Sequence, residues 1–146
     1  MRSHLLGVKS LVWLVPLCGL AGSPCVLADA DRARQDYMIH CMGCHGEQGE
    51  GFKEQVPSMR GTLARLATLP DGRSFLLRVP GVSRSSLDAE RMAEVLNWTL
   101  REFSAAETLR SIPPFTADEV TKARSRPLLE VSSTRVRVLR GEGLGQ

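Results

Sequence analysis

The amino-acid sequence predicts an all-α domain of four or five helices. Several segments carry apolar residues at the 3.6-residue spacing of a helix and are bounded by proline or glycine, and no segment shows the apolar and polar alternation of a strand. The chain has 146 residues, enough for one domain, and its 42% hydrophobic and 24% charged residues are ordinary for a globular protein. This composition excludes disordered and fibrous proteins.

Residues 1–28 are predicted to be a secretory signal peptide. Two basic residues precede a nearly continuous apolar run over residues 11–20, and small residues follow up to Ala28, the preferred cleavage site, with Ala30 as the alternative. Ten helical residues reach about 15 Å, half of the roughly 30 Å apolar layer of a bilayer, so a permanent membrane anchor is disfavoured. A lipid anchor on Cys18 or Cys25 is also disfavoured, because no small residue directly precedes either cysteine. The exported protein is therefore expected in the periplasm.

Removal of this segment changes both the charge and the cysteine count. It takes away two of the 19 basic residues and none of the 16 acidic ones, which leaves a net charge of +1 and two of the four cysteines. A protein that binds along a phosphate backbone needs clustered positive charge, so nucleic-acid binding is disfavoured.

The two remaining cysteines belong to the stretch Cys-Met-Gly-Cys-His, in which His45 follows Cys41 and Cys44. Two thiols one helical turn apart, followed at once by an imidazole, form the attachment pattern of a c-type haem. The thiols add to the two vinyl groups of the porphyrin, and the imidazole coordinates the iron. We therefore predict one covalently bound haem c per chain, held by Cys41 and Cys44, with His45 as the proximal iron ligand.

Two other uses of these cysteines stay open as alternatives. A thiol-disulfide oxidoreductase using Cys41 and Cys44 would have a strand before the pair and a helix after it, whereas here a helix is predicted before it and a glycine-rich loop over residues 46–51 after it. A structural zinc ion would need a fourth ligand. The only other histidine of the exported chain, His40, is interpreted as an exposed helix residue.

The helices are predicted from local signals along the exported chain. The first runs from Asp29, as its cap, to about His40, with Ala33 and Tyr37 on the inward side. Two short helices over residues 62–69 and 73–79 each stop at a proline. The helix with the strongest pattern follows: it is capped by Ser85 or Ser86 and carries a stripe of Met92, Val95, Leu96 and Thr99.

With these elements the chain resembles the class I c-type cytochromes over about residues 31–103. In that family the two terminal helices cross at a small residue. Two aromatic residues flank the crossing, one four positions before the first haem cysteine and one in the C-terminal helix. Ala33, Tyr37 and Trp98 match this arrangement. The resemblance implies a cytochrome c-like fold around the haem, with Tyr37 and Trp98 near it. It also implies that the carbonyl of Pro57 accepts a hydrogen bond from His45 and strengthens it as a ligand.

The resemblance leaves the sixth iron ligand open. Class I proteins usually supply a methionine just before the C-terminal helix, but residues 82–85 contain neither methionine nor histidine. Met59 is a candidate sixth ligand, although it falls on the His45 side of the haem, and Met92 belongs to the apolar stripe, so packing is the preferred role of both. Water, Lys53 and an open position are the other possibilities.

Residues 105–146 are predicted to form a C-terminal extension with one short helix. Thr116 and Glu119 form a capping box that opens this helix, and Pro127 limits it. From residue 120 onward the extension has six basic and two acidic residues, a charge that could steer an acidic redox partner but is more simply a solvated surface. Three apolar residues could pack the extension over the haem pocket: Leu128, Leu129 and Val131.

These features predict a periplasmic electron carrier and not an enzyme, because no paired carboxylates or nucleophile and base can be placed near the iron. Residues 29–104 are assigned to the cytochrome c domain, between the signal peptide and the extension. The resemblance implies a dehydrogenase as electron donor and a cytochrome or oxidase as acceptor. A haem protein that senses small ligands at an open sixth position is the alternative.

Overall fold

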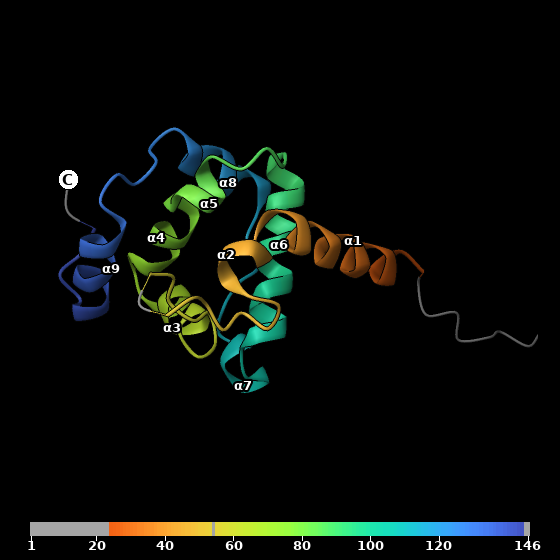
Figure 1. The fold of residues 1–146 in the computed structure, drawn as a ribbon, viewed down its shortest axis with the longest axis horizontal. Coiled ribbons are helices and arrows are strands. Elements are labelled where there is room, and N and C mark those ends of the chain that lie inside the picture. The colour runs from red at the N-terminus through yellow and green to blue at the C-terminus, as the bar shows by residue number, and fades with distance from the viewer. Residues whose placement is uncertain (1–23, 54, 145–146) are drawn as a thin grey trace, which may run out of the picture.

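The computed structural model describes residues 24–53 and 55–144, in which helices are joined by loops and turns (Figure 1). The described residues contain nine helical segments and no strand, so the predicted all-α class is confirmed while the predicted number of helices is too low. Three of the segments are single turns of four residues, too short to give a periodic pattern in the sequence. In chain order the segments are α1 (Pro24–His40), α2 (Met42–His45), α3 (Leu63–Thr68), α4 (Gly72–Arg78), α5 (Pro80–Ser83), α6 (Ala89–Phe103), α7 (Ala106–Leu109), α8 (Ala117–Arg124) and α9 (Val131–Arg140).

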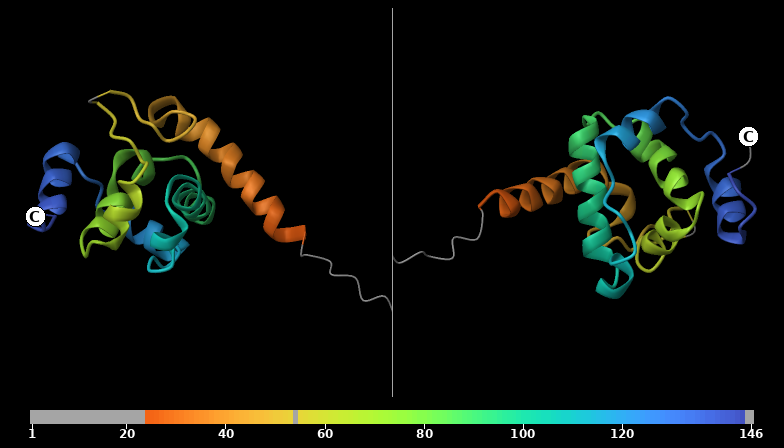
Figure 2. Two further views of the ribbon diagram at one scale, coloured as in Figure 1. Left: turned by 90° about the horizontal axis from the view of Figure 1, so that it is seen from below. Right: turned by 180° about the vertical axis from the view of Figure 1, so that it is seen from behind.

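The first helix begins earlier than predicted. Because α1 starts at Pro24, Asp29 lies inside the helix and is not its cap. Its N-terminal part extends away from the other helices (Figure 2). Residues 1–23 of the predicted signal peptide lie outside the described residues, and cleavage after Ala28 would fall within α1.

The crossing of α1 and α6 is the centre of the fold and is formed as the resemblance implied. Ala33 and Tyr37 are each 1% exposed, and the Tyr37 ring lies 5.1 Å from the Trp98 ring and 5.5 Å from the Phe103 ring, measured between centroids. Such tilted aromatic contacts add to the energy of apolar burial. Asp36, also buried, binds Arg91 across the crossing.

Helix α6 has the predicted apolar stripe but a different cap. Met92, Val95, Leu96 and Thr99 are all buried. The cap is Asp88, whose carboxylate accepts a 2.8 Å hydrogen bond from the backbone N–H of Arg91. The predicted caps, Ser85 and Ser86, lie upstream, and the hydroxyl of Ser85 accepts from the N–H of Leu87 instead. An aspartate at this position also interacts favourably with the helix dipole, which explains why it begins the helix.

The short helices α3 and α4 lie within one or two residues of their predicted bounds. They pack closely where Gly72 meets the end of α3: a Cβ at residue 72 would lie 1.8 Å from the carbonyl oxygen of Leu66. Pro80 ends α4 as predicted, but it also occupies the first turn of α5, where its missing N–H costs nothing.

The C-terminal extension contains three helices in its described part where one was predicted. The capping box of α8 is confirmed, with the Thr116 hydroxyl and the Glu119 carboxylate exchanging hydrogen bonds with each other's backbone N–H groups. Helix α9 was missed because it consists largely of β-branched and hydroxyl residues, which have weak helix propensity. Burial of Thr134 and Val138, one turn apart, overrides that propensity.

Arginine side chains attach the extension to α4. Arg73 donates to both carboxylate oxygens of Glu119, at 2.6 and 2.8 Å, and to the backbone carbonyls of Pro113 and Pro114. Its guanidinium also lies over the ring of Phe115, 4.2 Å from the centroid. Through these contacts α8 is fixed against α4, and the chain then leads to α9 on the outer side of α4 (Figure 1).

Candidate functional site

The cysteine and histidine motif is held in a single helical turn. Cys41 immediately precedes α2, whose last residues are Cys44 and His45, and the N–H of His45 donates to the carbonyl of Cys41 at 3.0 Å. Gly46 ends the turn with a φ of +78°, a conformation that glycine adopts easily. The hydroxyl of Tyr37 donates a 2.6 Å hydrogen bond to the carbonyl of Gly46, which ties the motif to α1.

A cavity of about 330 Å³ lies next to this motif, within the range of cofactor pockets. Cys41, Cys44 and His45 line one side of it. The rest of its lining is mostly apolar and comes from the loop over residues 55–59, from the exposed His40 at the end of α1 and from five further helices, among them Leu63 and Leu66 of α3, Phe75 and Leu76 of α4, Val82 of α5, Val95 and Leu96 of α6, and Val131 of α9. The structure thus brings the two predicted thiols and the imidazole to one apolar cavity.

Burial sets the protonation of the motif. It raises the pKa of the Cys41 thiol to about 11 and lowers the pKa of His45 below its usual value. The histidine is therefore neutral at physiological pH, the form that donates a lone pair to a metal. A redox cysteine needs a lowered pKa, so the raised value at Cys41 argues against the thiol-disulfide alternative.

The comparison with known proteins identifies the family. A curated protein named cytochrome c-552, from Thermus thermophilus, is 30% identical over 138 residues, which cover 82% of this chain and 88% of the relative. The chain belongs to the c-type cytochromes. A second cytochrome c-552, also from Thermus thermophilus, is 30% identical over 106 residues, 60% of this chain and 81% of the relative. No family model and no solved structure matches.

Membership in the c-type cytochromes implies an electron carrier with covalently bound haem, and the site fits this group. The Nδ1 atom of His45 is buried and has no hydrogen-bond partner among the described residues. Nδ1 is the ring nitrogen that the neighbouring loop would hold, so the other ring nitrogen is left to coordinate a bound iron. Beside two thiols and an apolar cavity, iron porphyrin has the matching chemistry.

The hydrogen bond expected between His45 and Pro57 is absent from this structure. Pro57 lines the cavity, but it is an exposed residue of its loop, whereas Nδ1 of His45 is buried without an acceptor. The loop itself is held by other bonds, among them the 2.8 Å bond from the N–H of Gly51 to the carbonyl of His45. The loop therefore reaches the motif through its backbone at Gly51 and not through Pro57.

The aromatic pair of this c-type cytochrome lies behind the cavity. Tyr37 and Trp98 occupy the helix crossing as expected, but neither lines the cavity beside His45. Tyr37 acts on the site through its hydrogen bond to Gly46, so the pair supports the cysteine and histidine turn from the side of α1. The nearness of the pair to the haem stays a prediction.

Both candidate methionines line the cavity. Met59 is half-buried, and Met92 is 1% exposed in the stripe of α6. Lys53 is exposed and does not line the cavity. Val82, from the segment where the family usually supplies its methionine, contributes an apolar side chain.

The sequence did not reveal Arg135, the residue of α9 that lines the cavity together with Val131. Their spacing of four residues places both on one helix face, but the signal was lost because α9 itself was not predicted. Of the other apolar residues named for the extension, Leu128 is buried and Leu129 is 80% exposed.

Two further features are absent from the described residues. Between residues 24 and 144, leaving out residue 54, no three histidine, cysteine or acidic side chains are grouped as metal ligands, as zinc would need. Over the same ranges, no helix combines the length and apolar character of a membrane span.

Proposed function

We propose that this c-type cytochrome is a periplasmic one-electron carrier with a single haem, attached through Cys41 and Cys44 and coordinated by His45. One observation carries the proposal: both thiols and a neutral imidazole, held in one helical turn, line the same apolar cavity. When bound, the haem supplies an iron that alternates between two oxidation states.

The residues of the chain define the environment of that iron. The thiols hold the porphyrin edge at α2, where Cys44 is exposed, and the imidazole supplies one axial ligand. The apolar side chains of α3 to α6 exclude water and disfavour the more charged oxidation state, which raises the reduction potential. Met59 is our candidate for the second axial ligand, since Met92 is already packed in the core stripe.

Export and partners complete the proposal. We assign residues 1–28 to a signal peptide, residues 29–104 to the cytochrome domain and residues 105–146 to the extension. Because the relatives are named cytochromes c-552, we propose redox proteins as partners, with a dehydrogenase as donor and a cytochrome or oxidase as acceptor.

Mass spectrometry of the secreted protein, produced in a host with a haem-attachment system, tests the proposal. We expect the mass of residues 29–146 plus one haem, retained after denaturation, and loss of covalent haem in a double variant with Cys41→Ala and Cys44→Ala. Cys25→Ala is the control, because this cysteine is expected to leave with the signal peptide. A wild-type mass without haem would overturn the function, and a heavier N-terminus would correct only the cleavage site.

Carbon monoxide tests the sixth ligand and the sensor alternative. If a protein side chain occupies the position, the spectrum of the reduced wild-type protein does not change with carbon monoxide. Met59→Leu would then admit the gas if Met59 is the ligand, whereas Met92→Leu would do so if Met92 is. A change in the wild-type spectrum would favour the small-ligand sensor.

A further inference from the structure

We propose that Arg135 of the C-terminal extension binds a propionate carboxylate of the haem, so that α9 completes the cofactor site. The inference rests on the proposed function, because it requires a haem in the cavity beside His45. It concerns a residue outside the domain that carries the cysteine motif.

The position of Arg135 follows from the way α9 is seated. The backbone N–H of Leu128 donates to the carbonyl of Arg78 at 2.9 Å, and the side chain of Arg78 donates to the carbonyl of Arg126 at 2.6 Å. These bonds fix the segment before α9 to the end of α4. Thr134 and Val138, each 2% exposed, then bury one face of α9.

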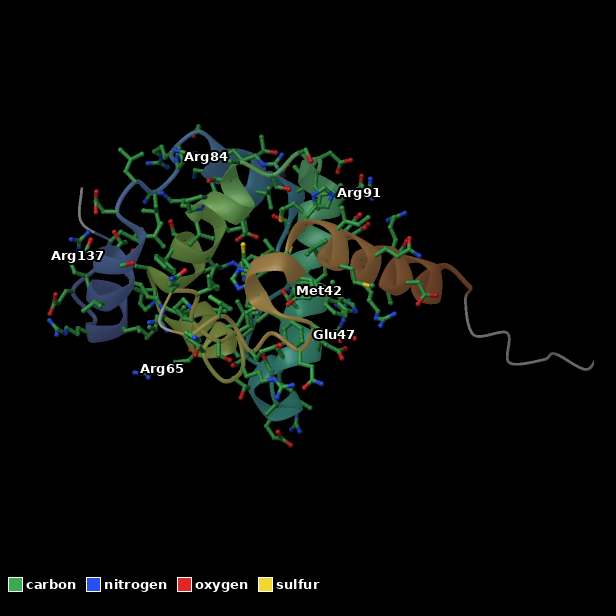
Figure 3. The ribbon with its side chains drawn as sticks, viewed as in Figure 1. Met42, Glu47, Arg65, Arg84, Arg91 and Arg137 are labelled. Atoms are coloured by element: carbon green, nitrogen blue, oxygen red, sulfur yellow. The ribbon has the colours of Figure 1, made fainter. Side chains whose placement is uncertain are left out.

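The adjacent face of α9 meets the cavity. Val131 and Arg135 are one turn apart, and both line it. Other basic residues of the extension have different neighbours: Arg124 donates to the carbonyl of Leu87, Arg137 to that of Leu144, and Arg140 lies 3.9 Å from Glu142. Arg137 is on the outer side of α9, away from the other helices (Figure 3).

The residues that line the cavity indicate which group of the haem Arg135 would bind. Among the described residues that line the cavity, Arg135 is the single lysine or arginine, and aspartate and glutamate are absent. Arg135 is half-buried and has no carboxylate within ion-pair distance in the described parts of the chain. A haem is a flat apolar ring with two carboxylates at one edge, and it matches an apolar cavity with one guanidinium at its side. Arginine binds carboxylates through two parallel N–H bonds, which gives both strength and orientation.

Reduction potentials of the haem-loaded protein test this assignment. A cation that neutralises a propionate favours the reduced, less positive iron, so Arg135→Gln is expected to lower the midpoint potential. Arg140→Gln is the matched control, since it removes the same charge from the same helix at a residue that does not line the cavity. We expect a clearly larger shift for Arg135→Gln, and a potential closer to wild type for Arg135→Lys, which keeps the charge.

Equal shifts in the two glutamine variants, or no shift in either, would overturn the assignment. Because the haem is covalently attached, a variant with a weakened propionate contact still carries it and can be titrated. If Arg135→Gln does not fold, Arg135→Met and Arg140→Met decide: a larger shift at residue 135 supports the contact, and equal shifts overturn it. Wild-type protein without haem would instead overturn the proposed function itself.

Discussion

Gly51 connects the loop of the cavity to the haem motif, and the structure leaves room only for glycine. Its φ is +77°, and a Cβ would lie 2.2 Å from the carbonyl oxygen of Val56 and 2.9 Å from the carbonyl carbon of Pro57. Its own N–H donates to the carbonyl of His45. A side chain at this position would therefore separate the loop from the motif.

Gly51→Ala is expected to destabilise the haem-loaded protein by more than the backbone conformation alone explains. The left-handed conformation costs a residue with a side chain about 1–2 kcal/mol, and the contact with two backbone groups adds to it. Gly61→Ala is the control, because Gly61 has a φ of +66° but nothing within 4 Å of a Cβ. Urea unfolding measures the loss of stability in both variants. Equal losses would show that the Val56 carbonyl does not restrict residue 51.

Among the site residues, the sequence predicted the arrangement of those that are neighbours along the chain. Cys41, Cys44 and His45 form one turn, so their spacing alone gives their geometry. The role of Pro57 stays a prediction, because it depends on how a loop is placed, and the expected bond to His45 is not formed in this structure. Arg135 lies 90 residues from His45 along the chain, and only the packing of α9 brings it to the same cavity.

Between elements, two ion pairs join α1 to α6 and differ in burial. Arg91 lies on α6 beside α1 (Figure 3), and its Nε is 3.0 Å from a carboxylate oxygen of Asp36, whose side chain is 2% exposed. Arg32 bonds to Glu94 across the same two helices. The two arginines are about equally exposed, but the Glu94 side chain is 23% exposed. The two pairs thus allow a comparison of buried and exposed contacts at one interface.

Arg91→Gln is expected to destabilise the protein by about 3 kcal/mol, because it leaves a buried carboxylate without its cation. The matched change Arg32→Gln is expected to cost much less, since water solvates both partners of that pair. Thermal unfolding of the two variants provides the measurement. If both variants lost the same stability, the burial of Asp36 would not be the cause.

The contact between Arg73 and Glu119 makes the docking of the extension sensitive to acid. The hydrogen bond from Arg73 holds the pKa of Glu119 below its ordinary value of 4.5. Because the pKa is lower in the folded state than in the unfolded state, this contact stabilises the protein fully above about pH 5 and is lost as the pH falls through the folded value.

We therefore expect Glu119→Gln to reduce stability at neutral pH, with a difference from wild type that shrinks below about pH 4. Urea unfolding across this range measures the difference. Glu107→Gln, a change at an exposed glutamate of α7, is the control and should give a small difference at every pH. A constant loss in Glu119→Gln would show that the ion pair is not the acid-sensitive contact.

The elements themselves were predicted to different extents for physical reasons. Helix α6 has a long amphipathic stripe and α8 a capping box, and both signals are local. The cap of α6 was placed two or three residues too early because several residues before it, Ser85, Ser86 and Asp88, can all cap a helix. The sequence of α9 contains no strong local helix signal, and its helical conformation depends on burial against α4.

The whole molecule is organised around one cavity, so its stability and its cofactor are linked. The apolar side chains around about 330 Å³ of space need partner atoms across it, and a bound porphyrin would supply them. The class of fold and the dependence on haem could be predicted from the sequence, but which helices share the apolar space becomes visible only in the structure.

The protein without haem is therefore expected to lose fixed tertiary structure while it keeps part of its helices. The double variant with Cys41→Ala and Cys44→Ala, produced without a haem-attachment system, supplies this form. Far-UV and near-UV circular dichroism should show helical signal with weakened aromatic signal, and the haem-loaded wild type should unfold in one cooperative step. A haem-free protein with a native near-UV spectrum would contradict this dependence.

Helix α9 packs on one side only, and this determines which part of the molecule unfolds locally first. Helix α9 rests mainly on α4, so it can detach at a lower free energy than the body, in which α6 is packed from several directions. Transient fraying would let water into the cavity at Val131 long before α1 and α6 separate. Amide exchange should accordingly be fastest in the last helix, and reagents that bleach the haem would enter from that side.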